Sequence, residues 1–312
     1  MERHIANANP RSVIILLLVA AATALGWSAS KAETPETVTL YVSVEQDGKA
    51  VGGLSARNFR VWEDGEAQPV NRAEPSGRAS VVLLVENNLV SWHFLNDAHS
   101  AMRGFLQAAP EGHQYALVTY GRSPTVEQGL TEEIDKIAQA YANARRSAWR
   151  ETDTYDAVYR VLEEMETLPG PAVLIVVGSG FDSFSQHTFG QLKRKAESVN
   201  VMIWGIATGS ELRQSDPPFL ESLTGVDLER GEMLLRMLSS TSGGKTFCPS
   251  CEADYQDSMR NTTESLDKLY TVVYERAGPP ADRFRKLKVE GFRLDADRRR
   301  DFKVRVRQGW RF

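Results

Sequence analysis

The fold is decided by residues 172–206, which read AVLIVVGSGFDSFSQHTFGQLKRKAESVNVMIWGI. Two short apolar runs, Ala172–Val177 and Val201–Ile206, have the length and composition of buried strands. The segment between them, Thr188–Ser198, has the pattern of a helix. A strand, a helix and a second strand in this order are typical of a sheet that is covered by helices.

The same alternation continues on both sides of this stretch. Ser80–Val85 (SVVLLV) and Tyr115–Tyr120 (YALVTY) are further apolar runs, and Lys245–Phe247 is a short strand. The sequence therefore predicts an α/β fold with a doubly wound, mostly parallel sheet and helices on both faces. The further predicted helices are His93–Ala108, Glu132–Ala144, Tyr155–Glu166, Gly231–Thr241 and Ala253–Lys268.

The two ends of the chain have a different pattern, because apolar and polar residues alternate there with period two. Turns centred on Asp47-Gly48 and Asp64-Gly65 separate the first strands. After a linker at Ala277–Pro280, two more alternating strands lie around Phe284–Gly291 and Phe302–Arg307. We expect these to pair with residues 38–72 in one small β subdomain. The expected organisation is a signal peptide over 1–32, a β segment over 33–76, the α/β domain over 77–276 and C-terminal β strands over 277–312.

The composition is that of an ordinary globular protein. The 312 residues are 42% hydrophobic and 25% charged, with a formal net charge of −4, which argues against a nucleic-acid-binding protein. Residues 276–312 hold 13 Lys and Arg against 5 Asp and Glu. This basic end could contact phosphate or acidic lipid, but solvated faces of strands explain it as well.

The first residues have the order of a secretory signal peptide. Arg3 and Arg11 precede an uncharged run, Val13–Trp27, and the small residues of Ser28–Ala32 follow. Cleavage after Ala32 would leave a periplasmic or secreted protein, with the membrane involved only if the signal stays uncleaved. The run has 15 residues, and a membrane-spanning helix needs about 20, so a permanent anchor is the lesser alternative.

Export would place both cysteines in an oxidising compartment. They stand as Cys248-Pro249-Ser250-Cys251, close enough to bridge each other, so we expect a local disulfide. A thiol-disulfide redox site is the alternative, because the pair follows a short strand and precedes a helix. A zinc site is not expected, since no second pair of Cys or His has suitable spacing.

Four segments in the predicted α/β domain resemble landmarks of the von Willebrand factor A domain in order and spacing. They are Val82–Val90 (VLLVENNLV), Thr152–Val158 (TDTYDAV), Leu174–Asp182 (LIVVGSGFD) and Ser242–Phe247 (SGGKTF). The sequence is more similar still to exported bacterial proteins called von Willebrand factor A-related. Those proteins have a β segment like Asp47–Trp62 before the domain and a basic strand pair like Phe284–Phe312 after it.

The resemblance implies a fold with a Rossmann-like sheet and a metal-ion-dependent adhesion site. In the family, Asp-x-Ser-x-Ser, a Thr and a further Asp hold magnesium, which suits hard oxygen ligands. This sequence keeps few of these ligands. Glu86 stands at the first Asp, Asn88 and Val90 at the two Ser, and Ser179 at the last Asp, while Thr152 alone is retained.

The site is therefore expected to be degenerate, and no cofactor is expected. A valine side chain cannot bind a metal, and Glu86 is the sole carboxylate at a matching position. Asp153, Asp182 and Ser91 lie near the same loops and could restore magnesium binding, which is one alternative. A second alternative is that these loops are only polar strand ends, which bind no ligand.

The sequence contains no complete motif of a catalytic serine or of a phosphate-binding loop. Gly178-Ser179-Gly180 lacks the second glycine of a G-x-S-x-G nucleophile turn, because Phe181 stands there. The histidines, among them His93 and His187, fall in no catalytic motif. Gly243-Gly244-Lys245-Thr246 lacks the earlier glycine of a phosphate-binding loop. We expect no enzymatic activity.

Function is expected at the loops that follow the carboxyl ends of the strands, where ligands bind in open α/β sheets. An insertion over 209–231 adds to them, and exposed aromatic residues are typical of binding hot spots. The sequence predicts an interaction module for an unknown protein of the cell envelope or outside the cell. The candidate contact residues are Trp92, Trp149, Phe181, Phe184 and Phe219.

Overall fold

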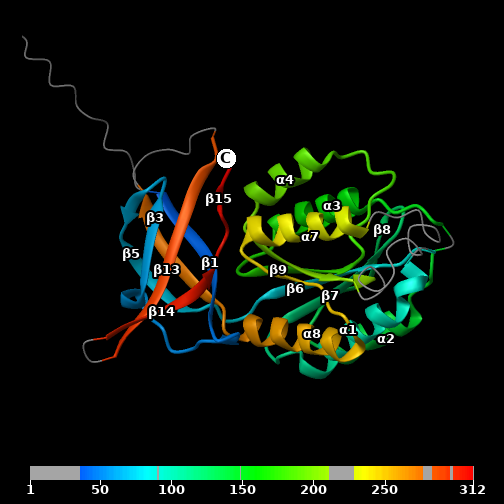
Figure 1. Ribbon diagram of the computed structural model, residues 1–312, viewed down its shortest axis with the longest axis horizontal. Coiled ribbons are helices and arrows are strands. Elements are labelled where there is room, and N and C mark those ends of the chain that lie inside the picture. The colour runs from blue at the N-terminus through cyan, green and yellow to red at the C-terminus, as the bar shows by residue number, and fades with distance from the viewer. Residues whose placement is uncertain are drawn as a thin grey trace, which may run out of the picture. The chain divides into compact units, whose positions relative to one another are not determined.

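The computed structural model describes residues 36–89, 91–147, 149–210, 228–276, 283–295 and 298–311 (Figure 1). The predicted signal peptide lies outside these residues, as do Val90, Phe219 and most of the 209–231 insertion. In the described part of the chain, every helix is too short or too polar to span a bilayer.

The first of two sheets has six strands in the order β11-β10-β9-β6-β7-β8. All neighbouring pairs are parallel except β7 and β8. Along the chain, β6 is the first strand of this sheet and lies in its middle. The later strands are added on both sides of it, as in doubly wound folds. The strands are β6 (Ser80–Glu86), β7 (Gln114–Tyr120), β8 (Pro124–Thr131), β9 (Ala172–Gly178), β10 (Val201–Ala207) and β11 (Thr246–Phe247).

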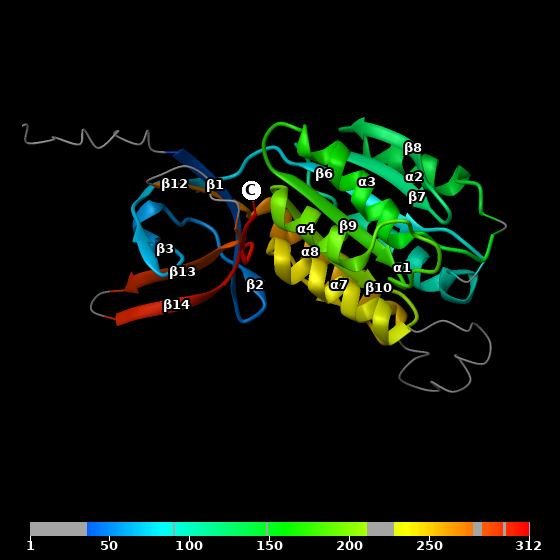
Figure 2. The same cartoon turned by 90° about the horizontal axis from the view of Figure 1, so that it is seen from above.

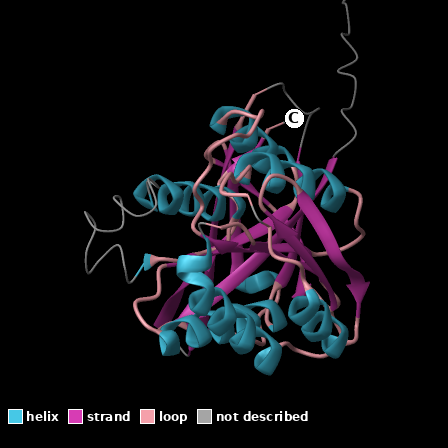
Figure 3. Ribbon diagram, turned by 90° about the vertical axis from the view of Figure 1, so that its right-hand side faces the viewer, coloured by secondary structure: helices cyan, strands magenta, loops and turns pink. Residues whose placement is uncertain are grey.

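Six described helices cover this sheet on both faces, as Figures 1 and 3 show. Successive residues of a strand point to opposite faces, so β6 supplies two cores. Val82 and Leu84 pack with α3 (Thr154–Glu166), α4 (Phe189–Ser198) and α7 (Leu228–Ser242). Val81, Leu83 and Val85 pack with α1 (Leu95–Ala108), α2 (Ile134–Asn143) and α8 (Glu252–Asp267). The predicted α/β fold class is confirmed.

The second sheet joins the two ends of the chain, as Figure 2 shows for β1, β13 and β14. Val44 pairs with Val304 and Val61 with Val289, so the predicted pairing of the terminal segments is confirmed. The strands are β1 (Glu36–Gln46), β2 (Lys49–Ala50), β3 (Phe59–Glu63), β4 (Glu66–Gln68), β5 (Val70–Pro75), β12 (Tyr270–Arg276), β13 (Arg285–Asp295), β14 (Arg298–Arg305) and β15 (Gly309–Trp310).

Two strands differ from the expectation. β12 pairs with β1 and β5 in the terminal sheet, although the boundary at residue 276 grouped it with the α/β domain. Its apolar residues Val272 and Tyr274 complete the terminal core. β8 was not expected at all, because it is a polar edge strand with few buried residues.

Arg307 ties the C-terminal segment to the α/β domain. The residue is 3% exposed, and its guanidinium donates to the carbonyl oxygens of Val199 (2.7 Å), Gly309 (2.7 Å) and Glu197. The charge also lies 3.3 Å from the centre of the Trp310 ring. Burial lowers the pKa of Arg307 to about 9.

Arg307→Ala is expected to lower the free energy of unfolding by about 2 kcal/mol, because buried carbonyl oxygens would lose their donor. Urea unfolding followed by circular dichroism measures this change. Arg298→Ala is the control, since Arg298 is exposed and should change stability by less than about 0.5 kcal/mol. Equal effects of the two substitutions would show that the buried contacts of Arg307 contribute nothing.

Candidate functional site

The candidate site lies where β6 and β9 end side by side. The two strands are parallel neighbours, with Val85 opposite Val177, so their carboxyl ends reach the same edge of the sheet. Glu86 is the last residue of β6, and Ser179 follows β9 directly. The structure therefore brings together two of the predicted positions that are 93 residues apart in the sequence.

The Glu86 carboxylate is buried, with 5% of the residue exposed, and both of its oxygens accept hydrogen bonds. The Ser179 backbone N–H donates to Oε2 at 2.5 Å, and the Asn88 amide donates to Oε1 at 2.9 Å. Burial raises the pKa of Glu86 above its ordinary value, although these hydrogen bonds act in the opposite direction. The carboxylate thus joins two strand ends inside the protein.

Asn88 and Ser91 form hydrogen bonds with each other in a tight turn. The Ser91 N–H donates to Asn88 Oδ1 at 2.7 Å, and the Asn88 N–H donates to Ser91 Oγ at 3.0 Å. The Ser91 hydroxyl in turn donates to the Asn88 carbonyl at 2.8 Å. Both residues are buried. Their polar atoms therefore fix the loop after β6.

The carboxylates that could replace the missing ligands are placed differently. Asp182 Oδ1 accepts hydrogen bonds from the Tyr155 N–H at 2.9 Å and from Ser185 Oγ at 2.5 Å. Asp153 precedes α3, and one of its oxygens is buried without a hydrogen bond. Burial raises the pKa of Asp182 and of Asp153, and nearby carboxylates add to both shifts.

Thr152, the one retained ligand position, is fully buried. Its hydroxyl lies 3.3 Å from Thr154 Oγ1, and its backbone N–H donates to Ser183 Oγ at 2.9 Å. The Ser183 N–H and hydroxyl both donate back to the Thr152 carbonyl, at 2.9 and 3.1 Å. Thr154 Oγ1 also donates to the Phe181 carbonyl. These bonds connect the loop before α3 to the loop after β9.

The oxygen atoms at this edge do not fit a magnesium ion. The described residues contain no group of three Asp, Glu, His or Cys side chains that could hold a metal. Magnesium prefers near-octahedral coordination by hard oxygen ligands, and Glu86 is the sole carboxylate at the matching positions.

Four of the predicted contact aromatics lie on the loops of this edge. Trp92 follows β6 and is 47% exposed, Trp149 lies between α2 and α3 and is 57% exposed, and Phe184 follows β9 and is 65% exposed. Phe181 is partly buried. Phe219 lies outside the described residues.

The predicted disulfide is absent from the structure. Cys248 and Cys251 are not bonded to each other. Arg236 donates to Cys248 Sγ at 3.1 Å, and Cys251 is the exposed residue that precedes α8. Adjacency in the sequence was the basis of the prediction, and the contact with Arg236 from α7 holds Cys248 instead.

His187 and Asp156 form a pair at the same end of the domain. His187 Nδ1 lies 2.7 Å from Asp156 Oδ1, and the ring stacks on Tyr159 at 3.9 Å. The backbone N–H groups of Gln186 and His187 also donate to this carboxylate, and these bonds and the histidine lower the pKa of Asp156 against the opposing effect of burial. The pair fixes the loop between β9 and α4.

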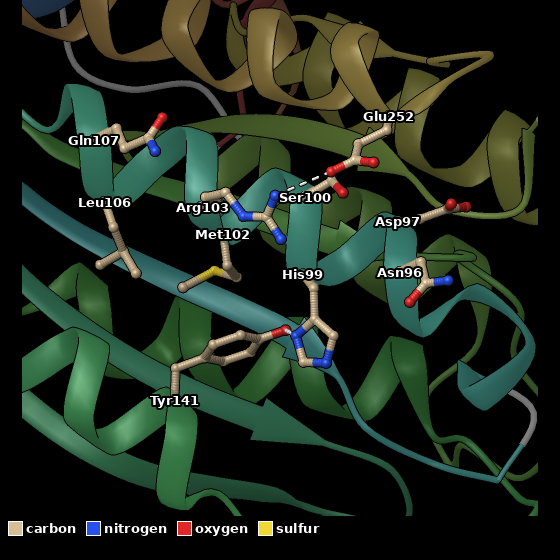
Figure 4. Close-up of a pocket in the computed structure, with 10 residues that line it drawn as sticks. All are labelled: Asn96, Asp97, His99, Ser100, Met102, Arg103, Leu106, Gln107, Tyr141 and Glu252. Carbon is tan, nitrogen blue, oxygen red and sulfur yellow. Dashed lines mark hydrogen bonds and ion pairs between the residues drawn. The ribbon is translucent and has the colours of Figure 1, made fainter.

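A separate pocket of 880 Å³ runs along α1 and includes residues of α2 and α8 (Figure 4). His99 Nδ1 lies 3.0 Å from Tyr141 Oη, and Arg103 forms a 3.0 Å ion pair with Glu252. Asp97 Oδ2 accepts hydrogen bonds from Tyr255 Oη and from the Gly209 N–H. Of the polar residues that line this pocket, Asp97, His99, Arg103, Tyr141 and Glu252 are therefore paired within the protein.

The sequence interpretation missed several arginines at the carboxyl edge. Arg122 follows β7, and Arg145, Arg146 and Arg150 lie between α2 and α3, next to Trp149. The segment 145–150 (RRSAWR) contains three of these arginines within six residues. Only the fold shows that Arg122, from another loop, lies 5.0 Å from the Trp149 ring.

No family model and no curated protein matches the chain. Solved structures do. One is proximal thread matrix protein 1 from the mussel byssus with a zinc-occupied MIDAS motif, at 15% identity and TM-score 0.45 over 66% of this chain and 50% of that one. A second is the ArnB paralog VWA2 from Sulfolobus acidocaldarius, at 13% identity and TM-score 0.41 over 88% of this chain and 76% of that one. A third is the SpRpn10 VWA domain, at 12% identity and TM-score 0.38 over 58% of this chain and 93% of that one.

This chain thus spans about half the length of the mussel protein. Two of the three names include VWA, the domain that the sequence resembles.

Proposed function

We propose that this chain is an exported protein-interaction module that binds a protein partner through the loops at the carboxyl edge of its six-stranded sheet. Binding needs no divalent cation and involves no catalysis. The observation that carries the proposal is the exposure of Trp92, Trp149 and Phe184 on loops that are otherwise fixed by hydrogen bonds.

Each of these aromatics leaves a large apolar side chain in water. Exposed aromatics at the centre of a surface are typical of binding hot spots, where burial against a partner recovers the hydrophobic free energy. The loops that carry them are held together, since the Leu89 N–H donates to the Trp149 carbonyl at 2.9 Å and Thr152 bonds Ser183. A surface fixed before binding loses less conformational entropy when the partner docks.

The hydrogen bonds of Glu86 support binding without metal. Its two oxygens accept hydrogen bonds from the Asn88 amide and the Ser179 N–H, and the side-chain oxygens of Asn88 and Ser91 accept from each other's backbone N–H groups. The same bonds give these residues another role, which is to hold the loops after β6 and β9 in place.

Export is proposed from the charged, apolar and small-residue order of residues 1–32. The partner is then a protein of the cell envelope or of the extracellular space.

Photo-crosslinking in the native host tests the proposal. Trp92→p-benzoylphenylalanine should give a discrete crosslinked product, because position 92 would contact the partner. Adding Trp149→Ser or Phe184→Ser should lower the yield at least about tenfold, the loss expected for a hot-spot aromatic.

Leu294→Ser is the matched control for these substitutions. Leu294 is 64% exposed on β13 in the terminal sheet, so its replacement should leave the yield unchanged. The proposal fails if position 92 gives no product, or if Leu294→Ser lowers the yield as much as Trp149→Ser does.

A further inference from the structure

We infer that the partner presents an acidic segment, which binds an arginine cluster formed by Arg122, Arg145, Arg146 and Arg150 around Trp149. This inference rests on the proposed function and adds the chemistry of the partner. All four arginines and Trp149 are exposed.

The cluster surrounds a real concavity. A pocket of 780 Å³ is lined by Arg122, Arg145 and Trp149, together with polar residues such as Asn87 and Thr119. A second pocket of 270 Å³ shares Asn87 and Thr119 and is lined by Arg146 and Glu86. The two pockets are therefore neighbours at the carboxyl edge, with arginines in both walls.

The backbone that carries these arginines is fixed. The Asn87 amide donates to the Arg145 carbonyl at 2.9 Å, and the Leu89 N–H donates to the Trp149 carbonyl at 2.9 Å. Gly121, next to Arg122, packs closely too, since a methyl group there would lie 3.3 Å from the Asn87 carbonyl oxygen. The loops thus present their side chains from a defined position.

The guanidinium groups are available to a partner. No ion pair joins any of the four to a carboxylate within the part of the chain that the structure describes. Some exposed arginines elsewhere are paired, as Arg78 is with Glu132, Arg103 with Glu252 and Arg260 with Asp257. Arg122 instead lies over the Trp149 ring, 5.0 Å from its centre.

Three partly buried carboxylates lie near the cluster, and the buried Glu86 lines the smaller pocket. Glu127 lines the larger pocket and accepts a hydrogen bond from Thr119 Oγ1 at 2.7 Å. Asp153 interacts with Arg122 and Glu151 at longer range, and its raised pKa reduces its charge at acidic pH. The four arginines are exposed, whereas these four acids are partly or fully buried, so the charge that a partner meets here is mainly positive, although the whole chain has a formal net charge of −4.

Acidic side chains fit this arrangement. A guanidinium binds a carboxylate through two parallel hydrogen bonds, and a tryptophan face accepts an apolar or aromatic side chain beside it. An acidic protein segment uses both features. A nucleic acid would need a longer track of cations, and the acidic net charge of the chain disfavours it.

Two variants with equal charge change test the inference. Arg145→Glu/Arg146→Glu removes the cluster, while Lys49→Glu/Arg298→Glu makes the same change at exposed positions of the terminal sheet. The first should lower the crosslinking yield from position 92 at least about tenfold, and the second should leave it unchanged.

Fluorescence anisotropy tests the chemistry directly. A labelled peptide of alternating Glu and Trp should bind the purified chain at least about tenfold more tightly than its Gln-for-Glu analogue. Arg145→Glu/Arg146→Glu should abolish the difference. A labelled thymidine oligonucleotide serves as the nucleic-acid probe and should bind more weakly than the acidic peptide.

The outcomes separate this inference from the proposed function. A crosslink that persists in Arg145→Glu/Arg146→Glu, or equal affinity for the two peptides, overturns the acidic segment and leaves the interaction module standing. Absence of any crosslink at position 92 overturns both. Tighter binding of the oligonucleotide, lost in the same variant, would replace the acidic protein by a nucleic acid.

Discussion

Gly180→Ala is expected to lower the free energy of unfolding by about 4 kcal/mol, from a strained backbone and a steric overlap together. Gly180 has a φ of +73°, which L side chains rarely adopt. A methyl group there would lie 2.7 Å from the Gly231 carbonyl carbon and nearer still to its oxygen, where the start of α7 packs on the loop after β9. Urea unfolding at neutral pH measures the change.

Gly112→Ala is the matched control for the cost of placing a side chain at a positive φ. Gly112 has a φ of +84°, but a methyl group there would meet no atom within 4 Å. This substitution should cost only about 1–2 kcal/mol. If both substitutions cost the same, the close approach of Gly180 and Gly231 contributes nothing, and the loop after β9 is not held by α7.

Glu86→Ala is expected to lower the free energy of unfolding by about 3 kcal/mol at acidic pH, because the Ser179 N–H and the Asn88 amide would be left without an acceptor. The loss should be smaller at neutral pH. Burial raises the pKa of Glu86, so the charged carboxylate is less favourable in the folded than in the unfolded chain.

The sign of the pH dependence follows from that shift. The contribution of Glu86 to stability is fully present below its ordinary pKa of 4.5 and decreases as the pH rises through the raised pKa of the folded state. Urea unfolding over a series of pH values should show this decrease in the wild type. Glu86→Gln, which does not titrate, should lack it, and an identical pH profile in both proteins would contradict the burial of the carboxylate.

The sequence predicts the central sheet well because β6, β7, β9 and β10 are apolar runs whose burial shows in composition. The polar edge strand β8 carries no such signal, since its hydrogen bonds to β7 form only in the fold. Alternation in the terminal segments likewise predicts strands that need partners. It does not predict that β12 belongs with them, because a strand's partners are set by tertiary packing.

The candidate site is predicted in part. Matching positions indicate Glu86 and Ser179, but the bond between them depends on two strand ends that lie far apart in the sequence. The arginine cluster is missed for the same reason, because Arg122 joins Arg145 and Arg146 only through the fold. The cysteine pair shows the reverse error, since closeness in sequence predicts a bond that the structure does not form.

The central claim is that partner binding at the carboxyl edge needs no divalent cation. Crosslinking from Trp92→p-benzoylphenylalanine, carried out on native envelopes in EDTA and again in magnesium chloride, tests it most directly. We expect the same yield of the same product under both conditions. A product that disappears in EDTA and returns with magnesium would contradict it.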